Sequence, residues 1–144
     1  MIETVIALAV VILLVSSLIS MSIASVRSAS LSRSKNAASQ LAYRESELVR
    51  VTRDNAMTWT DFTNNVGGAT CTSKCHVDSS TLTFVSNETT DSSLVSGTTF
   101  TIYLKQTNPP PPLTSEFDYS VYVTWTDSSG GHTESISSIL TPWK

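Results

Sequence analysis

The sequence predicts an α+β protein in which one long N-terminal α-helix packs on a small antiparallel β-sheet of about four strands. No glycine or proline occurs from Met1 to Val66, so nothing interrupts a helix over almost the first half of the chain. Beyond Gly68 the chain changes to short runs in which apolar and polar residues alternate, which is typical of strands with one buried face. At 144 residues, the chain has room for one modest globular domain beside such a helix.

The first region, residues 1–26, is apolar enough to cross a membrane. It carries one charge, on Glu3, and the next charge is that of Arg27. The twenty residues from Thr4 to Ile23 would form a helix of roughly 30 Å, about the thickness of the hydrocarbon core of a bilayer. A secretory signal peptide would begin with basic residues, carry a shorter apolar run and end at a small-residue cleavage site. The segment lacks a convincing version of these features, so we expect the helix to be retained.

Glu3 is the most unusual residue of this region. An ionised side chain deep in lipid costs about 2.5–3.5 kcal/mol on insertion scales, so a plain anchor has no reason to carry it. Either Glu3 lies near the membrane interface and reaches the headgroups, or a positive charge of another molecule compensates it. The serines at positions 16, 17, 20 and 22 are where a bend or local melting of the helix is expected, because hydroxyls can bond to helix carbonyls.

The second region, residues 27–60, is interpreted as the amphipathic half of the same helix, which would end at about residue 55–60. Apolar residues recur there at three- and four-residue steps, the spacing of one helix face. They are Leu31, Ala38, Leu41, Ala42, Leu48, Val49, Ala56 and Trp59. This stripe is the natural cover for the apolar face of the sheet, and the segment 64–68 would end the helical region.

The third region, residues 61–144, is predicted to be a globular head that contains the sheet. Alternating runs predict strands at 81–85, 98–105, 119–126 and, more weakly, 133–140. The segment 127–131 is suited to a hairpin connection between the last two. Asn108 and the four prolines that follow it cannot join a sheet, so they are interpreted as a stiff, exposed polyproline connection.

Charge is unevenly distributed around the net value of −3. Residues 27–53 carry six basic and two acidic side chains, whereas residues 54–144 carry three basic and nine acidic ones. A basic segment beside an acidic head could attract anionic lipid or the head of a neighbouring copy, and the acidic head argues against nucleic-acid binding. The arginines after the apolar run would keep the head in the cytoplasm, whereas its Ser/Thr-rich composition and cysteine pair suit an extracytoplasmic face.

Cys71 and Cys75 form a second chemically suggestive group. A disulfide between them would staple the link between helix and sheet. Two other interpretations stay open. His76 follows the pair directly, as in covalent c-type haem attachment with His132 as a distant ligand, although the cysteine spacing is one residue too long. The same four residues could also hold zinc, although they lack a second close pair.

Asn87 begins the tripeptide Asn-Glu-Thr, an acceptor pattern for N-linked glycosylation and a weak signal in so short a motif. O-linked sugar is equally plausible in a head so rich in serine and threonine. The sequence contains no Gly-rich phosphate loop and no Ser-His-Asp arrangement, and it has two histidines. We therefore expect neither enzyme activity nor a cofactor.

The run Ile2–Val11, with its isolated acid, its long apolar helix and the amphipathic half and small sheet behind it, resembles the type IV pilins. This family includes the minor pilins and the pseudopilins of type II secretion. The resemblance is detailed over about the first 55 residues and extends to coarse architecture beyond them. In the family, a glutamate stands at the fifth position of a mature chain that starts with an N-methylated residue, after a prepilin peptidase removes a short basic leader. Glu3 matches that position if two residues and the leader precede Met1.

The resemblance implies a structural subunit that polymerises through its N-terminal helix. The subunit would be held in the inner membrane and then built by the pilus assembly machinery into an extracellular helical filament of identical copies, for adhesion or motility. In the family, the glutamate meets the terminal ammonium of a neighbour inside the filament core, which makes Glu3 the expected assembly residue. Because a buried carboxylate is tolerated only when paired, such a pair would set the axial register of the subunits.

Many family members break this helix with glycine or proline, whereas Ile12 and Ser20 stand at the corresponding places here. The resemblance therefore implies either a more continuous helix or a melt at the serines. Two alternatives lie near this interpretation, namely a minor pilin and a secretion pseudopilin. Two lie further away: a single-span membrane protein with a small binding ectodomain that never polymerises, and a membrane-anchored haem carrier.

Overall fold

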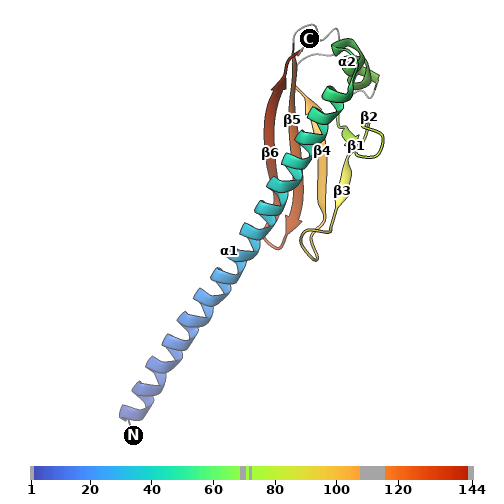
Figure 1. Ribbon diagram of the computed structural model, residues 1–144. Coiled ribbons are helices and arrows are strands. Elements are labelled where there is room, and N and C mark those ends of the chain that lie inside the picture. The colour runs from blue at the N-terminus through green and yellow to red at the C-terminus, as the bar shows by residue number, and fades with distance from the viewer. Residues whose placement is uncertain (1, 69–70, 72, 108–115, 143–144) are drawn as a thin grey trace. The chain divides into compact units, whose positions relative to one another are not determined.

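The computed structural model of the chain has the predicted α+β fold, with a long N-terminal helix and an antiparallel sheet of four strands (Figure 1). It describes residues 2–68, 71, 73–107 and 116–142. The contacts within the chain divide it into two compact units, Met1–Ser34 and Lys35–Lys144. The boundary after residue 26 that was predicted from the sequence marks a different change, from apolar to charged composition. The predicted polyproline connection at residues 108–112 lies outside the described residues.

The first unit consists of the N-terminal part of helix α1, which as a whole spans Ile2–Asn55. The side chains of residues 2–30 are all exposed. Ser16, Ser20 and Ser22 donate their hydroxyl hydrogens to the carbonyls four residues earlier, over 2.8, 2.9 and 3.0 Å. The helix is continuous across these serines, so the bend or melting expected there is not observed. The hydroxyls bond to the helix backbone without displacing its own hydrogen bonds.

Within the second unit, the remaining part of α1 covers the sheet with one face. The buried residues of this face in the second unit are Ala37, Ala38, Leu41, Ala42, Glu45, Val49 and Thr52. Four of them belong to the predicted apolar stripe, and a fifth member of the stripe, Leu48, is half-buried. The small side chains of Ala38 and Ala42 on this face are completely buried. Ser46 adds a polar contact, because its Oγ lies 3.0 Å from the hydroxyl of Tyr119 in the sheet.

A second helix, α2, spans Trp59–Gly68, and the sequence did not predict it as a separate element. Thr58 caps its N-terminus, because its Oγ1 accepts the backbone N–H of Asp61 over 3.1 Å and its hydroxyl donates to the Asp61 carboxylate over 2.8 Å. This Thr-x-x-Asp pattern is the sequence signal for the new helix start. Trp59, which was assigned to the stripe of the long helix, instead begins α2. The helix ends in the predicted segment 64–68.

The main sheet has four antiparallel strands in the order β3-β4-β5-β6. They are β3 (Thr89–Asp91), β4 (Phe100–Gln106), β5 (Phe117–Asp127) and β6 (Gly130–Leu140). A separate hairpin pairs β1 (His76–Asp78) with β2 (Thr83–Val85). Three predicted runs became β4, β5 and β6, and the run at 81–85 became β2 of the small sheet. The sequence missed β1 and β3, because three residues are too few for alternation to be recognised.

The register places every second residue of β5 in the core. The five inward side chains are Phe117, Tyr119, Val121, Val123 and Trp125. Phe62 of α2 packs edge-on against Phe117 and Phe84, with ring centroids 5.5 and 6.0 Å apart, so one aromatic cluster joins α2, β2 and β5. The predicted hairpin at 127–131 is present, with Asp127 paired to Gly130 and Gly130 at φ 127°, a conformation that favours glycine.

Cys71 and Cys75 form the predicted disulfide, with their Cα atoms 5.1 Å apart. The bonded segment also extends the sheet. Cys75 exchanges two backbone hydrogen bonds with Leu104, of 3.0 and 2.6 Å, and the N–H of Gln106 donates to the Cys71 carbonyl over 3.1 Å. The segment thus lies along the part of β4 that the short strand β3 does not reach. Because both sulfurs are bonded to each other, the haem and zinc interpretations of this pair are wrong.

Replacing both cysteines by serine should lower the free energy of unfolding by about 2 kcal/mol, from the entropy of closing so short a loop. Both cysteines are buried, so the polar replacements add to the loss. Thermal unfolding of the detergent-solubilised chain, followed by circular dichroism, would measure the change. Treatment of the wild type with a reductant under denaturing conditions is the matched control. An unchanged melting temperature would show that the disulfide does not stabilise the head.

Three strand ends carry the same Asp-Ser-Ser turn, which the sequence analysis missed. The turns begin at Asp78 after β1, at Asp91 after β3 and at Asp127 after β5. In each turn one aspartate oxygen accepts both the backbone N–H and the hydroxyl of the second serine, over 2.5–2.8 Å. These bonds favour the ionised form, so the pKa of each aspartate lies below its usual value. The repeated turn fixes the ends of three strands.

The hairpin between β5 and β6 should make the head less stable in strong acid. The hydroxyl of Ser129, together with His132, lowers the pKa of Asp127 to about 2. Because the pKa is depressed in the folded state, this contribution is complete above the unfolded value of 3.8 and is lost as the pH falls toward about 2. Asp127→Asn should therefore reduce the fall in melting temperature over that window. Asp118→Asn, on the same strand but outside such a turn, is the control, and equal curves for wild type and Asp127→Asn would contradict the prediction.

Candidate functional site

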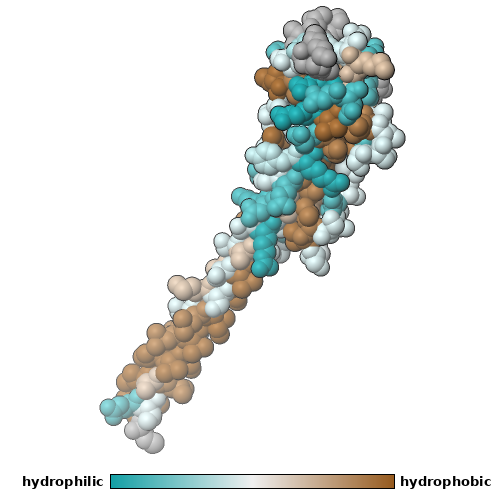
Figure 2. Space-filling view, in the orientation of Figure 1, coloured by the Kyte–Doolittle hydropathy of each residue, from teal (hydrophilic) through white to brown (hydrophobic). Residues whose placement is uncertain are grey.

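The first unit presents a continuous apolar surface to its surroundings. Fifteen large apolar side chains between Ile2 and Val26 are 48–79% exposed. The most apolar window of α1 has a mean hydropathy of 2.7 and none of it is buried within the chain, so the helix is long and apolar enough to cross a membrane. Apolar side chains dominate this part of α1 in the space-filling view (Figure 2). Monomeric soluble proteins rarely expose so large an apolar surface, which therefore marks contact with lipid or protein.

Glu3 lies in the first turn of α1, where the helix dipole favours a carboxylate. Its side chain is exposed, and the described part of the chain supplies no ion pair or side-chain hydrogen bond to it. The apolar surface therefore carries one carboxylate that other molecules must compensate if the surface becomes buried. This is the residue that the sequence analysis singled out for assembly.

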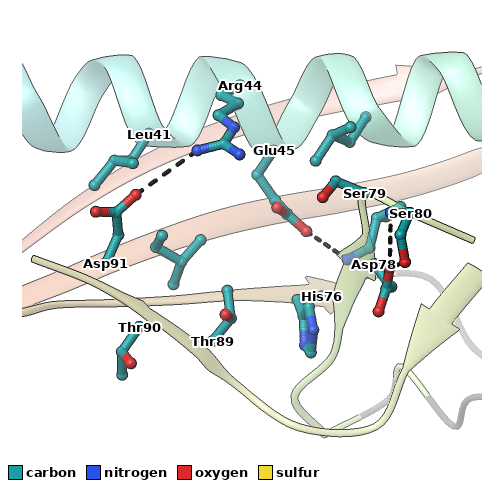
Figure 3. A pocket seen from close by; sticks show the side chains of 13 residues that line it. Leu41, Arg44, Glu45, His76, Asp78, Ser79, Ser80, Thr89, Thr90 and Asp91 are labelled. Carbon is teal, nitrogen blue, oxygen red and sulfur yellow. Dashed lines mark hydrogen bonds and ion pairs between the residues drawn. The ribbon is translucent and has the colours of Figure 1, made fainter. Parts of the chain in front are cut away.

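The head contains a pocket of about 400 Å³ that the sequence analysis did not predict. Figure 3 shows its side chains, which come from α1, from β1 and the turn after it, and from β3 and β4. Its charged and titratable members are Arg44, Glu45, His76, Asp78 and Asp91. Leu41 and Ile102 supply apolar wall, and serine and threonine hydroxyls line much of the rest. The pocket is thus a polar hollow with an excess of carboxylates.

Glu45 is the buried carboxylate of this pocket, with 5% of its surface exposed. Its Oε1 accepts the backbone N–H of Val77 over 2.6 Å, so a side chain of α1 occupies the place that a strand would take beside β1 (Figure 3). Burial raises the pKa of Glu45, and the hydrogen bond from Val77 opposes the rise. In the sequence, Glu45 stood out only as one of the two acidic side chains of residues 27–53. Its position, four residues from both Leu41 and Val49 on the buried stripe, is the signal that could have identified it.

Two further contacts shape the pocket. Arg44 Nη1 lies 3.7 Å from Asp91 Oδ2, and its side chain is 64% exposed, so the pair is a weak, solvent-screened one. The Nδ1–H of His76 donates to the backbone carbonyl of Asn87 over 3.1 Å, which orients the imidazole at the pocket wall. Neither contact reaches Glu45 directly, so its carboxylate has one protein hydrogen-bond partner among the residues that the structure describes.

The other predicted site residues lie apart from one another. Asn87 is exposed in the bend between β2 and β3, where an attached sugar would meet solvent, and its glycosylation stays a prediction. His132, the distant ligand of the haem and zinc interpretations, lies on β6. There its Nε2 is 3.0 Å from Asp127 and its ring stacks on Trp125.

Over the described residues, no group of three or more histidine, cysteine, aspartate or glutamate side chains is arranged to hold a metal ion. Comparison of the chain with protein-family models, with curated proteins and with solved structures finds no match. The exposed apolar helix with Glu3 and the polar pocket beside Glu45 are the two features that call for a partner.

Proposed function

We propose that this chain is a pilin-like structural subunit, which polymerises through the first part of α1 into an extracellular filament of the type IV pilus kind. Before assembly the same helix would hold the subunit in the inner membrane. The observation that carries the proposal is the carboxylate of Glu3 in the first turn of α1, because it is the one charged side chain of residues 2–26 and this whole stretch of the helix is exposed.

Two physical arguments support assembly over simple anchoring. An anchor needs apolar length alone, and a carboxylate at depth in lipid costs about 2.5–3.5 kcal/mol. In a bundle of identical helices, the carboxylate can pair with the terminal ammonium of a neighbour, and an unpaired copy is then disfavoured by about 3–5 kcal/mol. Glu3 would thereby select one axial offset between subunits, while the apolar side chains of residues 2–26 fill the filament core.

The head suits the outer surface of such a filament. It contains a disulfide, which fits an oxidising compartment, and its exposed surface is rich in serine and threonine. Cleavage by a prepilin peptidase and transfer by an assembly machinery belong to the same proposal. The roles of major pilin, minor pilin and secretion pseudopilin share this chemistry.

Fractionation of cells that express the complete gene tests the proposal. Mechanical shearing should release the chain in filaments that sediment at high speed and that negative-stain electron microscopy can image. Antibody labelling of the head should decorate the filaments along their length. A chain that remains wholly in the membrane fraction, in cells that assemble other filaments normally, would instead favour the single-span membrane protein with a small ectodomain.

A further inference from the structure

We propose that the pocket beside Glu45 binds a basic side chain, an ammonium or guanidinium group, that a second copy of this chain presents from residues 27–35. The inference rests on the filament function proposed above and deepens it by naming a contact between neighbouring copies outside the apolar core. The pocket lies in the head, and the proposed occupants lie on α1, between its apolar part and the segment that covers the sheet.

The pocket has more negative charge than its own cation can neutralise. Three carboxylates line it, from Glu45, Asp78 and Asp91, against one permanently charged cation, Arg44. One oxygen of each carboxylate accepts a hydrogen bond from a backbone N–H: Glu45 from Val77, Asp78 from Ser80 and Asp91 from Ser93. The second oxygens of Glu45 and Asp78 have no hydrogen-bond partner within the described ranges of the chain. The pocket therefore contains carboxylate oxygens that could accept hydrogen bonds from an incoming cation.

Keeping the Glu45 carboxylate ionised in this pocket is energetically unfavourable. It is almost completely buried, and desolvation raises its pKa despite the hydrogen bond from Val77. A cation that entered the pocket would compensate the buried charge at short range, where screening by water is weak. Asp78 and Asp91, nearer the solvent, would attract the cation to the mouth of the pocket.

The chain itself carries the matching cations. Arg27, Arg33 and Lys35 are exposed, and the described residues form no ion pair with them. By contrast, Arg44, Arg50, Arg53 and Lys74 each lie within 4 Å of a carboxylate of their own chain, and the one other described lysine, Lys105, stands alone on β4. Three unpaired cations within nine residues and a pocket with unpaired carboxylate oxygens are complementary surfaces of one molecule. In an array of identical copies, each copy supplies both.

The spacing along α1 defines the axial offset that this contact requires. Lys35 and Glu45 lie ten residues apart in the helix, which corresponds to about 15 Å of rise. Two parallel copies displaced by that distance would bring Lys35 of one copy level with the pocket of the other. A bare metal ion is a poorer occupant, because the described side chains form no metal-ligand cluster, whereas a volume of about 400 Å³ admits the end of a lysine or arginine.

Zero-length cross-linking of the full chain tests the contact. A carbodiimide joins a lysine amine to a carboxylate only when the two groups touch, and mixing isotopically labelled with unlabelled copies distinguishes links between chains from links within one. We expect links between Lys35 of one copy and Asp78 or Asp91 of another. Lys35→Arg, which keeps the charge and removes the amine, should eliminate them. The variants Arg27→Lys and Arg33→Lys should add links from those positions if they also enter the pocket.

A second measurement tests the charge itself. Glu45→Gln keeps an oxygen to accept the Val77 N–H and removes the negative charge, so association of copies should weaken about tenfold and lose part of its sensitivity to salt. Glu47→Gln, two residues further along α1 and on its exposed side, is the matched control and should change neither. The melting temperature of each variant establishes that the head is folded.

The outcomes separate this inference from the proposed function. Filaments that form normally, but give no link from residues 27–35 to the pocket and ignore Glu45→Gln, overturn the inference and leave the filament function standing. Links between copies that remain in the membrane and never form filaments support the pocket contact and overturn the filament function. A chain that does not associate under any condition overturns both.

Discussion

Glu3→Ala should abolish filament assembly while the chain accumulates normally in the membrane. The alanine variant removes the one charged group of an apolar segment, so insertion into lipid becomes easier, by about 2.5–3.5 kcal/mol if the residue lies at depth. In the proposed filament core, however, the substitution would leave the neighbour's terminal ammonium buried without a partner, which typically costs about 3–5 kcal/mol. The same change thus favours the membrane and disfavours the polymer. The measurement is the amount of chain in the sheared filament fraction relative to the membrane fraction.

The control for this experiment is Ser22→Ala, which also removes a polar group from the exposed apolar helix. Its hydroxyl already bonds to the carbonyl of Leu18, so its loss should leave the assembly ratio unchanged. Glu3→Gln separates charge from hydrogen bonding, because the amide keeps the shape and cannot form the ion pair. Wild-type filament yields from Glu3→Ala would refute the role assigned to this residue.

Glu45→Ala should lower the free energy of unfolding by about 2 kcal/mol, the largest effect that we expect from a polar residue of the head. The substitution leaves the buried N–H of Val77 without its acceptor, at a cost of about 1–3 kcal/mol, and removes the carboxylate together with one buried methylene group worth about 0.8 kcal/mol. Relief of the buried charge offsets part of this loss. Thermal or denaturant unfolding of the solubilised chain measures the difference, with Glu47→Ala as the exposed control.

Glu45 should also make the head more stable in mild acid than at neutral pH. Its pKa is raised in the folded state, so the folded protein binds the proton more tightly than the unfolded chain does. Its contribution is therefore complete below the unfolded value of 4.5 and is lost as the pH rises through the folded value. Glu45→Gln removes this dependence, so its melting temperature should equal or exceed that of the wild type at pH 7. Parallel pH curves for the two proteins above pH 4.5 would contradict the assignment.

The parts of the fold that the sequence predicted are those with long, regular patterns. The 54-residue α1 and the strands β4, β5 and β6 each repeat their periodicity often enough to be recognised. The elements that were missed depend on single interactions: α2 on the cap made by Thr58, β3 on pairing with β4, and β1 on pairing with β2 and on Glu45. The Thr58 cap is a local contact whose Thr-x-x-Asp pattern was overlooked, whereas the bond between Glu45 and Val77 joins residues 32 apart in the sequence. Hydrophobic periodicity reports neither kind of contact.

The candidate site divides in the same way. Glu3 could be identified from the sequence, because an isolated charge in an apolar run is visible without a fold. The pocket could not, since its carboxylates come from α1 and from two short strands that only the folded chain brings together. Glu45 gave one local sign, its place on the buried face of the helix, and the Asp-Ser-Ser repeat gave another. Neither sign indicates by itself that Glu45 and the aspartates of these turns line the same pocket.

The small sheet of β1 and β2 is attached to the rest of the head mainly by side chains. It has three residue pairs of its own, against eleven between β5 and β6. Glu45 holds Val77, Asn65 accepts the N–H of Phe84 over 3.2 Å, and the disulfide segment provides the link to β4. Segments with so few ladder bonds open locally at a lower free energy than the core around them. We therefore expect the amides of this hairpin to exchange with deuterium before those of the main sheet, so one wall of the pocket can adjust to an incoming side chain while the rest of the head stays folded.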